Sequence, residues 1–347
     1  MMTSSTECVA AEGRGRTLTG TILVTGGMGF LGGHVVAALA RAGYTVRCLV
    51  RGAAPTESGS SGAEYVHGDL LDRLSLDRAL DGAAAVVHVA GFVSAAARDR
   101  SRLFAVNVAG ARHLLEAAGA AGVRRAVFTS STSAVGALHA DRPDRALAED
   151  AAFNLASLPV PYVQAKRLAH EAALAARQAG LPVVILSPTF VLGPGDVRLT
   201  SSELVDAFVR GRVPGYLAGG LNPIDVRDLA PAYVAALEHP DPAPQYILAG
   251  SENLTTHAFF KRLERASGVR APRFRIPYRL ALMAGALADR FAPGASLTSA
   301  AVRLGSLYWY FDGSAARREL GLRTRCLDET LATSVDWVRH RAACPTE

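Results

Sequence analysis

The chain has 347 residues, of which 50% are apolar and 20% are charged. This composition can bury a large core and excludes a disordered or fibrous protein. The formal net charge of +6 comes from dispersed arginines rather than a basic block, and aromatic residues are not interleaved with them. The charge pattern therefore does not favour a nucleic-acid-binding protein, and we expect a small-molecule partner.

The cysteines and the apolar runs indicate the compartment. Cys8, Cys48, Cys326 and Cys344 form no CxxC pair and have no nearby histidines at metal-binding spacing. We expect reduced thiols in a cytoplasmic protein that has no metal site. Residues 1–16 predict a disordered extension without the apolar region of a signal peptide. The longest apolar run, 280–288, is too short to span a bilayer, so no membrane partner is expected.

Short apolar runs alternate with helical patterns over the first half of the chain. Strands are predicted at 21–25, 45–50, 63–67, 84–89, 125–130 and 182–186, with helices ending at 42 and covering 72–80, 103–121 and 160–179. This alternation predicts βαβ units in a Rossmann-type, doubly wound parallel α/β sheet. We assign residues 17–192 to this dinucleotide-binding domain.

From residue 193 onward glycine and proline become frequent and the alternation stops. Helices are predicted at 226–237, 256–267, 279–290, 313–320 and 326–341, with one strand at 246–248. Residues 193–347 are expected to form a smaller, helix-rich substrate lobe, interleaved with the first domain near 222–250.

Glycines follow the first strand directly. Gly26, Gly29 and Gly32 stand between that strand and a helix, where glycine permits a tight turn and lets backbone N–H groups approach a pyrophosphate. Residues inside the turn, namely Met28, Phe30 and Leu31, are predicted to contact the same cofactor. The alternative is that the glycines only allow close packing of strand and helix.

The second strand ends without the carboxylate that binds the ribose hydroxyls of NAD. It reads Val46-Arg-Cys-Leu-Val50-Arg51, so Arg51, or Arg47 as second candidate, offers a guanidinium to the 2′-phosphate of NADP. A solvated surface arginine is the alternative.

Further candidates stand at the ends of the third and fourth strands. Asp69 is placed to accept from the adenine amino group and Leu70 to pack on the ring, while Val89 and Ala90 are small enough to let the cofactor pass. An aspartate at a strand end is commonly just a helix cap, so neither pair alone predicts a cofactor site. The prediction depends on their order at the carboxyl ends of successive strands, where open α/β sheets bind ligands.

Tyr162 and Lys166 are four residues apart in a predicted helix and therefore share one face. Lowering a tyrosine pKa from about 10 to about 7 takes roughly 4 kcal/mol, which one ammonium about 4 Å away supplies at an effective dielectric near 20. Taken alone the pair is typical of a solvated helix surface. With Ser131 after the fifth strand, it predicts a proton-transfer centre with a hydroxyl that holds the substrate oxygen.

These motifs, in this order, resemble the extended branch of the short-chain dehydrogenases/reductases. The matching stretches are 25–32, 68–70, 88–91, Asn107 with Gly110, 129–131, Tyr162 with Lys166, and 193–196; further likeness at 224–229 and 310–321 is to its dihydroflavonol-reductase-like members and to hopanoid-associated epimerase-like proteins.

The resemblance implies roles for individual residues. Tyr162 is the acid/base, Lys166 lowers its pKa and binds the nicotinamide ribose, and Ser131 orients the substrate. Pro188 and Val191 lie near the nicotinamide, and Arg51 matches an NADP-contacting arginine. The likeness also implies a homodimer that pairs helices 103–121 and 160–179.

The sequence departs from the sugar-nucleotide members in the stretch before Gly193, which lacks their arginine and tyrosine, and at Gly136, which lacks the preceding tyrosine. Ser131 also has no adjacent Asp-Glu pair of the kind that dehydratase members use. These absences weaken the interpretation as a sugar-nucleotide enzyme. Arg227 either holds an anionic group or pairs with Asp225 or Asp228.

The reading favoured by these residues is an NADP(H)-dependent reductase or dehydrogenase that acts on a carbonyl or secondary alcohol of a small, fairly apolar metabolite. The alternatives are an NAD(P)-dependent sugar epimerase and a non-catalytic NADP-binding regulator.

Overall fold

The first strand leads straight into the glycine turn. In the computed structural model, which describes residues 18–52, 62–94, 97–292 and 297–343, β1 (Thr21–Thr25) is buried beyond its first residue and α1 (Phe30–Arg41) begins after Gly29. The predicted extension at 1–16 lies outside the described residues, as do Cys8 and Cys344. Both remaining cysteines, Cys48 and Cys326, are free thiols.

Seven parallel strands form one sheet in the order β10-β6-β5-β4-β1-β2-β3. Its other strands are β2 (Thr45–Val50), β3 (Glu64–His67), β4 (Ala83–His88), β5 (Arg125–Thr129), β6 (Val183–Pro188) and β10 (Gln245–Leu248). The strand order reverses between β1 and β4, and α/β sheets bind ligands outside the carboxyl ends of the strands at such a switch point. The predicted Rossmann-type fold is confirmed.

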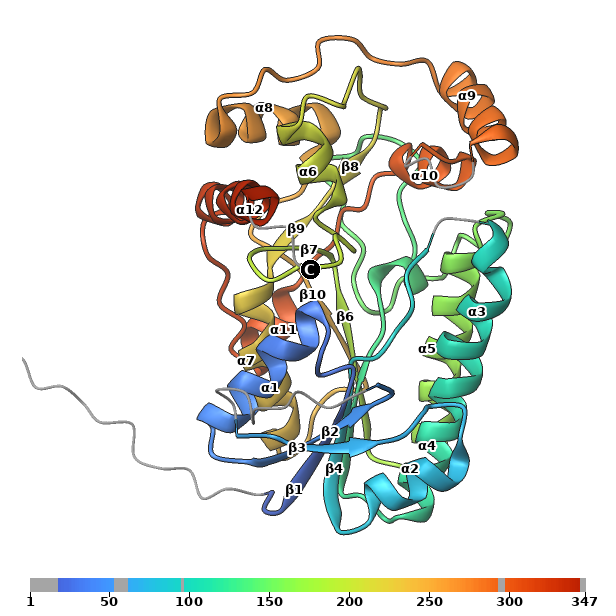
Figure 1. Ribbon diagram of the computed structural model, residues 1–347, viewed down its shortest axis with the longest axis vertical. Coiled ribbons are helices and arrows are strands. Elements are labelled where there is room, and N and C mark those ends of the chain that lie inside the picture. Colours follow the sequence, from blue (N-terminus) through green and yellow to red (C-terminus); the bar gives the residue numbers. More distant parts are fainter. Residues whose placement is uncertain (1–17, 53–61, 95–96, 293–296, 344–347) are drawn as a thin grey trace, which may run out of the picture.

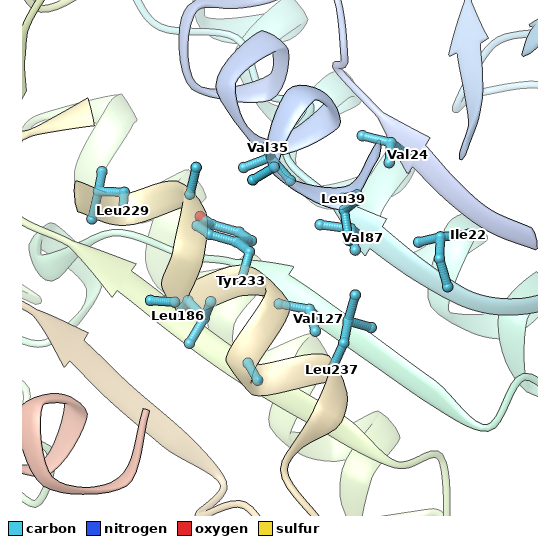
Figure 2. Close-up of a cluster of buried hydrophobic side chains, with 14 of the residues drawn as sticks. Ile22, Val24, Val35, Leu39, Val87, Val127, Leu186, Leu229, Tyr233 and Leu237 are labelled. Atoms are coloured by element: carbon cyan, nitrogen blue, oxygen red, sulfur yellow. The ribbon is translucent and has the colours of Figure 1, made fainter. Parts of the chain in front are cut away.

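Helices cover both faces of the sheet (Figure 1). One face carries α1 and α7 (Val226–Glu238), and the other carries α2 (Arg73–Leu80), α4 (Gly110–Ala120) and α5 (Pro161–Gln178). Figure 2 shows Tyr233 and Leu237 of α7 in the same apolar cluster as Val35 and Leu39 of α1. Segments from beyond residue 192 therefore complete this layer: α7 covers the sheet, and β10 is its edge strand.

Most of the remaining elements lie beyond the carboxyl ends of the strands (Figure 1). Helices α6 (Glu203–Val209), α8 (Thr256–Ser267) and α12 (Leu327–Ala343) share a core around Phe208, Phe259 and Leu331. Helices α9 (Tyr278–Phe291) and α10 (Ser299–Gly305) pack on each other, and α11 (Ser314–Glu319) packs near β10. Two small sheets pair β7 (Phe190–Leu192) with β9 (Pro223–Asp225), and β8 (Gly220–Leu221) with β11 (Leu254–Thr255).

One predicted helix has a different internal form. The helix predicted at 103–121 begins at Arg100 as α3 (Arg100–Phe104), continues as a π-helical segment (Ala105–Ala109) and then becomes α4. The sequence did not predict β7, β8, β9, β11, α6 or α10, because segments this short carry too few turns or alternations for a period to be read.

Within the described ranges, no helix has both the length and the apolar character needed to cross a membrane.

Candidate active site

The turn after β1 is built for close approach of backbone atoms. Gly26 has φ +75°, and a Cβ there would lie 2.5 Å from the backbone nitrogen of Ala90. A Cβ at Gly32 would lie 2.0 Å from the carbonyl oxygen of Gly26. Gly29 stands at the N-cap of α1, where no side chain caps the first turn. The start of α1 thus presents N–H groups and the positive end of its dipole, which fits the pyrophosphate of a dinucleotide.

A buried polar pair joins the ends of β1 and β4 beside this turn. Thr25 Oγ1 lies 2.7 Å from His88 Nδ1, and the N–H of Ala90 donates to the same hydroxyl oxygen. Burial, with a smaller contribution from the charge of Lys166, lowers the pKa of His88 to about 3. His88 is therefore neutral, and it fixes the end of β4 without adding charge.

Helix α5 brings Tyr162 to the hydroxyls after β5. Pro161 occupies the first turn of α5, where its missing N–H is not needed. The Tyr162 hydroxyl lies beside the hydroxyls of Ser131 and Ser133, and both of these lower its pKa. Ser131 Oγ in turn accepts from the Ser133 hydroxyl at 3.0 Å and from its backbone N–H at 3.2 Å. The predicted set therefore acquires Ser133, which the sequence reasoning did not single out.

The pKa of Tyr162 moves in the opposite direction to the expectation. Burial raises the pKa of Tyr162, and the hydrogen bonds with Ser131 and Ser133 only partly offset this effect. Burial also lowers the pKa of the Lys166 ammonium to about 8. Burial therefore favours the neutral form of both the phenol and the amine.

The ammonium of Lys166, from α5, approaches the chain just after β4 at Gly91, a residue that has no side chain. A Cβ at Gly91 would come within 3.6 Å of Lys166 Nζ and 3.4 Å of Asn107 Oδ1. Asn107, in the π-helical segment, accepts from the N–H of Phe92 and donates to its carbonyl, both at 2.8 Å. The sequence assigned no role to Asn107. In the structure its side chain holds the backbone of Phe92 in place beside Lys166.

The loop after β7 closes on the first turn of α1. His34 Nε2 lies 3.1 Å from the carbonyl oxygen of Pro194. Asp196, which is fully buried, accepts hydrogen bonds from the backbone N–H groups of Thr200, Ser201 and Ser202. These bonds hold its pKa below the ordinary value although burial acts the other way. The sequence placed Asp196 in a family motif, but its role as the anchor of this loop depends on the fold.

The two candidate phosphate-binding arginines differ in their contacts. Arg47 donates to Glu64 and to the carbonyl oxygens of Ala79 and Asp81, so it serves the structure of the sheet edge. Arg51 is exposed at the end of β2. The structure therefore favours Arg51 over Arg47 as the group available to a ligand.

Residues at the end of β3 have structural partners of their own. The Asp69 carboxylate accepts from the N–H of Leu71 at 2.9 Å. Leu70 is 7% exposed and packs closely against Gly110, where an added Cβ would lie 2.9 Å from the Leu70 side chain. Leu70 is thus part of the core at this edge, and Asp69 is partly exposed above it.

The open question on Arg227 is answered by its contacts. Arg227 donates to both carboxylate oxygens of Asp225, at 2.9 and 2.7 Å, and to Thr333. Asp228 instead accepts from Arg325. Arg227 is a structural partner of Asp225 rather than an anion clamp.

Several predicted cofactor residues gather at this edge of the sheet. Met28 is 55% exposed in the turn, and Phe30 packs edge-on against His34. Leu31, Val89 and Val191 are partly buried and pack against the same core cluster. Pro188 ends β6, and its carbonyl accepts from Thr132.

The surroundings of Tyr162 are apolar. Tyr162 packs against a cluster that includes Leu155 and Leu307, and Leu304 and Trp309 border the same cluster. These side chains come from the loop before α5, from α10 and from the segment that follows α10.

The match to a family model decides the classification. The model described as the NAD dependent epimerase/dehydratase family matches residues 22–249. The chain belongs to this family. It is an NAD(P)-dependent oxidoreductase of the extended short-chain dehydrogenase/reductase type, with a fold and a glycine turn suited to that cofactor.

Named relatives span nearly the whole chain. It is 33% identical to a putative dihydroflavonol 4-reductase of Synechocystis, over 93% of this chain and 96% of the relative. It is also 33% identical to sterol demethylase protein B of Methylococcus capsulatus, over 92% of this chain and 99% of the relative. A solved structure described as a nucleoside-diphosphate-sugar epimerase from Pseudomonas aeruginosa aligns with a TM-score of 0.76 and 27% identity, over 92% of this chain and 98% of that one.

Proposed function

We propose that the protein is an NADP(H)-dependent reductase or dehydrogenase that interconverts a carbonyl and a secondary alcohol of a small, apolar metabolite. The observation that carries this proposal is the position of Tyr162 beside the hydroxyls of Ser131 and Ser133, with Lys166 one helical turn away. When bound, the nicotinamide supplies or accepts the hydride.

In the reducing direction, the substrate oxygen takes the place of one hydroxyl partner of Tyr162. Ser131 holds that oxygen, and Tyr162 donates its proton to it as the hydride reaches the carbonyl carbon. The Lys166 ammonium then stabilises the phenolate that remains. In the oxidising direction the same groups act in reverse.

The apolar cluster around Tyr162 supports an apolar substrate. The side chains that pack with Tyr162 in this cluster, including Leu155, Leu304, Leu307 and Trp309, carry no charge. The names of two relatives, which refer to a dihydroflavonol and to a sterol, agree in kind with a hydrophobic ring compound.

Two further parts of the proposal concern the cofactor and the assembly. Arg51, exposed and away from the ion pairs of Arg47, is proposed to bind the 2′-phosphate and so to favour NADP(H). A homodimer is proposed across the groove between α4 and α5, which is lined by small residues such as Gly119, Ala172 and Ala175.

The test is single-turnover reduction of apolar ketones with NADPH. Replacement Tyr162→Phe is expected to slow hydride transfer at least ~100-fold, while the dissociation constant for NADPH stays within about threefold, because the phenol moves a proton and contributes little binding. Tyr44→Phe, which removes a hydroxyl bonded to Glu238, serves as the matched control and keeps activity. Near-wild-type turnover of Tyr162→Phe would refute the proposal.

A sugar-nucleotide epimerase remains a second candidate because one structural relative carries that description. Inversion of a nucleotide sugar without net NADPH consumption would support it over a reductase.

A further inference from the structure

Helix α9 packs on the molecule through its smallest residues. Ala281 is 3% exposed, and a Cβ added at Gly285 would lie 2.8 Å from the backbone nitrogen of Ser299, at the start of α10. Asp289 accepts hydrogen bonds from the backbone N–H and the hydroxyl of Ser299. These contacts fix the rotation of α9 about its own axis.

With its small face inward, α9 presents its large apolar side chains to solvent. Leu280, Met283, Leu287 and Phe291 are 58%, 63%, 59% and 76% exposed. Their spacing of three and four residues places them along one stripe. A surface helix normally buries its apolar stripe against the core of the protein. Helix α9 has the opposite orientation, with its large apolar side chains facing solvent.

A further exposed aromatic ring lies in the segment before α9. Phe274 is 76% exposed, and its backbone is held: its carbonyl accepts from the N–H of Tyr216 at 3.0 Å, and the N–H of Ile276 donates to the carbonyl of Tyr216 at 2.9 Å. We call Leu280, Met283, Leu287 and Phe291 the apolar face. In Figure 1, α9 lies at the outer corner of the upper part, next to α10.

Positive charge surrounds the apolar face. Residues 273–291 contain four arginines and one aspartate, a net charge of +3, and the aspartate is the one bonded to Ser299. Arg279 precedes Met283 by four residues and Arg290 follows Leu287 by three, so both guanidiniums border the stripe. Exposed arginines of this kind lay their stems on apolar surface and extend their charge to an anionic layer.

We propose that α9 docks on the surface of an anionic lipid bilayer, with the apolar face inserted at the boundary between headgroups and acyl chains and the arginines at the headgroups. A helix with an apolar stripe flanked by basic residues has this mode of binding. A second copy of the chain fits less well, because its equivalent face carries the same positive charge.

This inference revises the expectation that the chain has no membrane partner. That expectation rested on the length of the run 280–288, which is too short to span a bilayer. A helix that lies in the interface has no such length requirement.

The docking surface is one helix away from the proposed catalytic tyrosine. Helix α10, which packs on α9, contributes Ala300 and Leu304 to the apolar cluster that contacts Tyr162. The proposed docking of α9 does not depend on the proposed function.

The test is flotation of the full chain with vesicles of phosphatidylcholine, with or without an equal part of phosphatidylglycerol. We expect at least ~10-fold tighter binding to the anionic vesicles at low salt, with the preference reduced at high salt. The double variant M283E/L287E is expected to lose at least ~10-fold in binding to them, since two inserted side chains become carboxylates beside an anionic surface. The matched control Leu74→Glu changes a leucine that is 72% exposed on α2 and keeps the binding.

NADPH binding by each variant verifies that it is folded. Equal vesicle binding by wild type and M283E/L287E would overturn the proposal, as would no binding by the wild type. A dimer that M283E/L287E converts to monomer, without vesicle binding, would instead identify α9 as a contact between copies and would also overturn it. Tyr162→Phe separates the two proposals, because it is expected to lose reduction and keep vesicle binding.

Discussion

Burial favours the neutral form of both residues in the proposed proton-transfer pair. It raises the pKa of Tyr162 and lowers the pKa of Lys166 to about 8. Burial therefore imposes an electrostatic cost on the Lys166 ammonium, and a negatively charged phenolate at Tyr162 would reduce that cost. Lys166 and Lys261 are the two lysines of a chain that otherwise uses arginine for positive charge. Lysine suits a partly buried site because its pKa shifts readily, whereas arginine stays charged.

The first prediction concerns stability. The folded pKa of Lys166, about 8, is below its ordinary value of 10.5, so below pH 8 the folded protein carries a charge that unfolding would rehydrate. Lys166→Met is therefore expected to raise the free energy of unfolding of the ligand-free protein by ~1–3 kcal/mol at pH 7. The gain should shrink as pH rises from 8 to 10.5, because the folded wild type has then lost the proton while the unfolded chain still binds it, so wild-type stability rises with pH.

Urea denaturation at pH 7 and at high pH measures this difference. The exposed Lys261 provides the control, since Lys261→Met should show no comparable gain at pH 7. A pH-independent effect of Lys166→Met would contradict the burial argument.

The second prediction concerns cofactor preference. Arg51→Gln is expected to weaken NADPH binding by ~10- to 100-fold, because a charge-assisted contact of ~1.5–3 kcal/mol is lost. NADH binding should change little, since NADH has no 2′-phosphate. Titration of both cofactors, with the exposed Arg145→Gln as control, measures the ratio. An equal loss for both cofactors would remove Arg51 from the 2′-phosphate site.

At the scale of elements, the glycine turn shows how local geometry serves a ligand. Gly32 and Gly33 are neighbours in the first turns of α1, yet their surroundings differ. A Cβ at Gly32 would be 2.0 Å from a backbone oxygen, whereas a Cβ at Gly33 would meet its nearest atom at 3.7 Å. The first glycine is required by close packing, and the second is not.

The third prediction uses this pair. Gly32→Ala is expected to displace the turn, to destabilise the protein by ~2–4 kcal/mol and to abolish detectable NADPH binding. Gly33→Ala should leave the fold intact and stabilise it by up to ~1 kcal/mol, because alanine is the better helix former. Thermal unfolding and NADPH titration of both variants distinguish them. Similar behaviour of the two would show that the turn does not depend on close approach.

At the scale of the whole molecule, the late part of the sequence completes the early part. Helix α7 supplies Leu229, Tyr233 and Leu237 to the core that α1 begins, and Tyr233 also hydrogen-bonds Thr129 of β5 at 2.9 Å. Strand β10 pairs with β6 at the edge of the sheet. The carboxyl ends of the strands and the apolar cluster at Tyr162 are thus held by segments far apart in the chain.

The fourth prediction concerns the proposed homodimer. Ala175 is exposed in the groove between α4 and α5, and Ala175→Arg is expected to convert a dimer to a monomer, because the long side chain keeps the two helix pairs apart. Light scattering at micromolar concentration measures the mass. Ala140→Arg, an exposed change outside the groove, should have no effect. A wild-type monomer, or a dimer that tolerates Ala175→Arg, would contradict this interface.

The alternation of strands and helices, the glycine turn and the spacing of Tyr162 and Lys166 could all be predicted from the sequence. Each depends on relations between residues close together in the chain, where helical and strand periods dictate which side chains share a face. Helix α3 and the π-helical segment were harder to predict from the sequence. The hydrogen bonds between Asn107 and Phe92 depend on a segment after β4 that is 15 residues away in the chain.

Only the tertiary structure decided the questions in which a distant neighbour matters. It assigned Arg47 and Arg227 to structural partners, and it buried Tyr162 so that the pKa of the phenol is raised. It also turned the small face of α9 toward α10 and left the large apolar side chains outside. A sequence pattern identifies an apolar stripe, but packing against other segments decides whether that stripe faces the core or the solvent, because burial is a property of the whole fold.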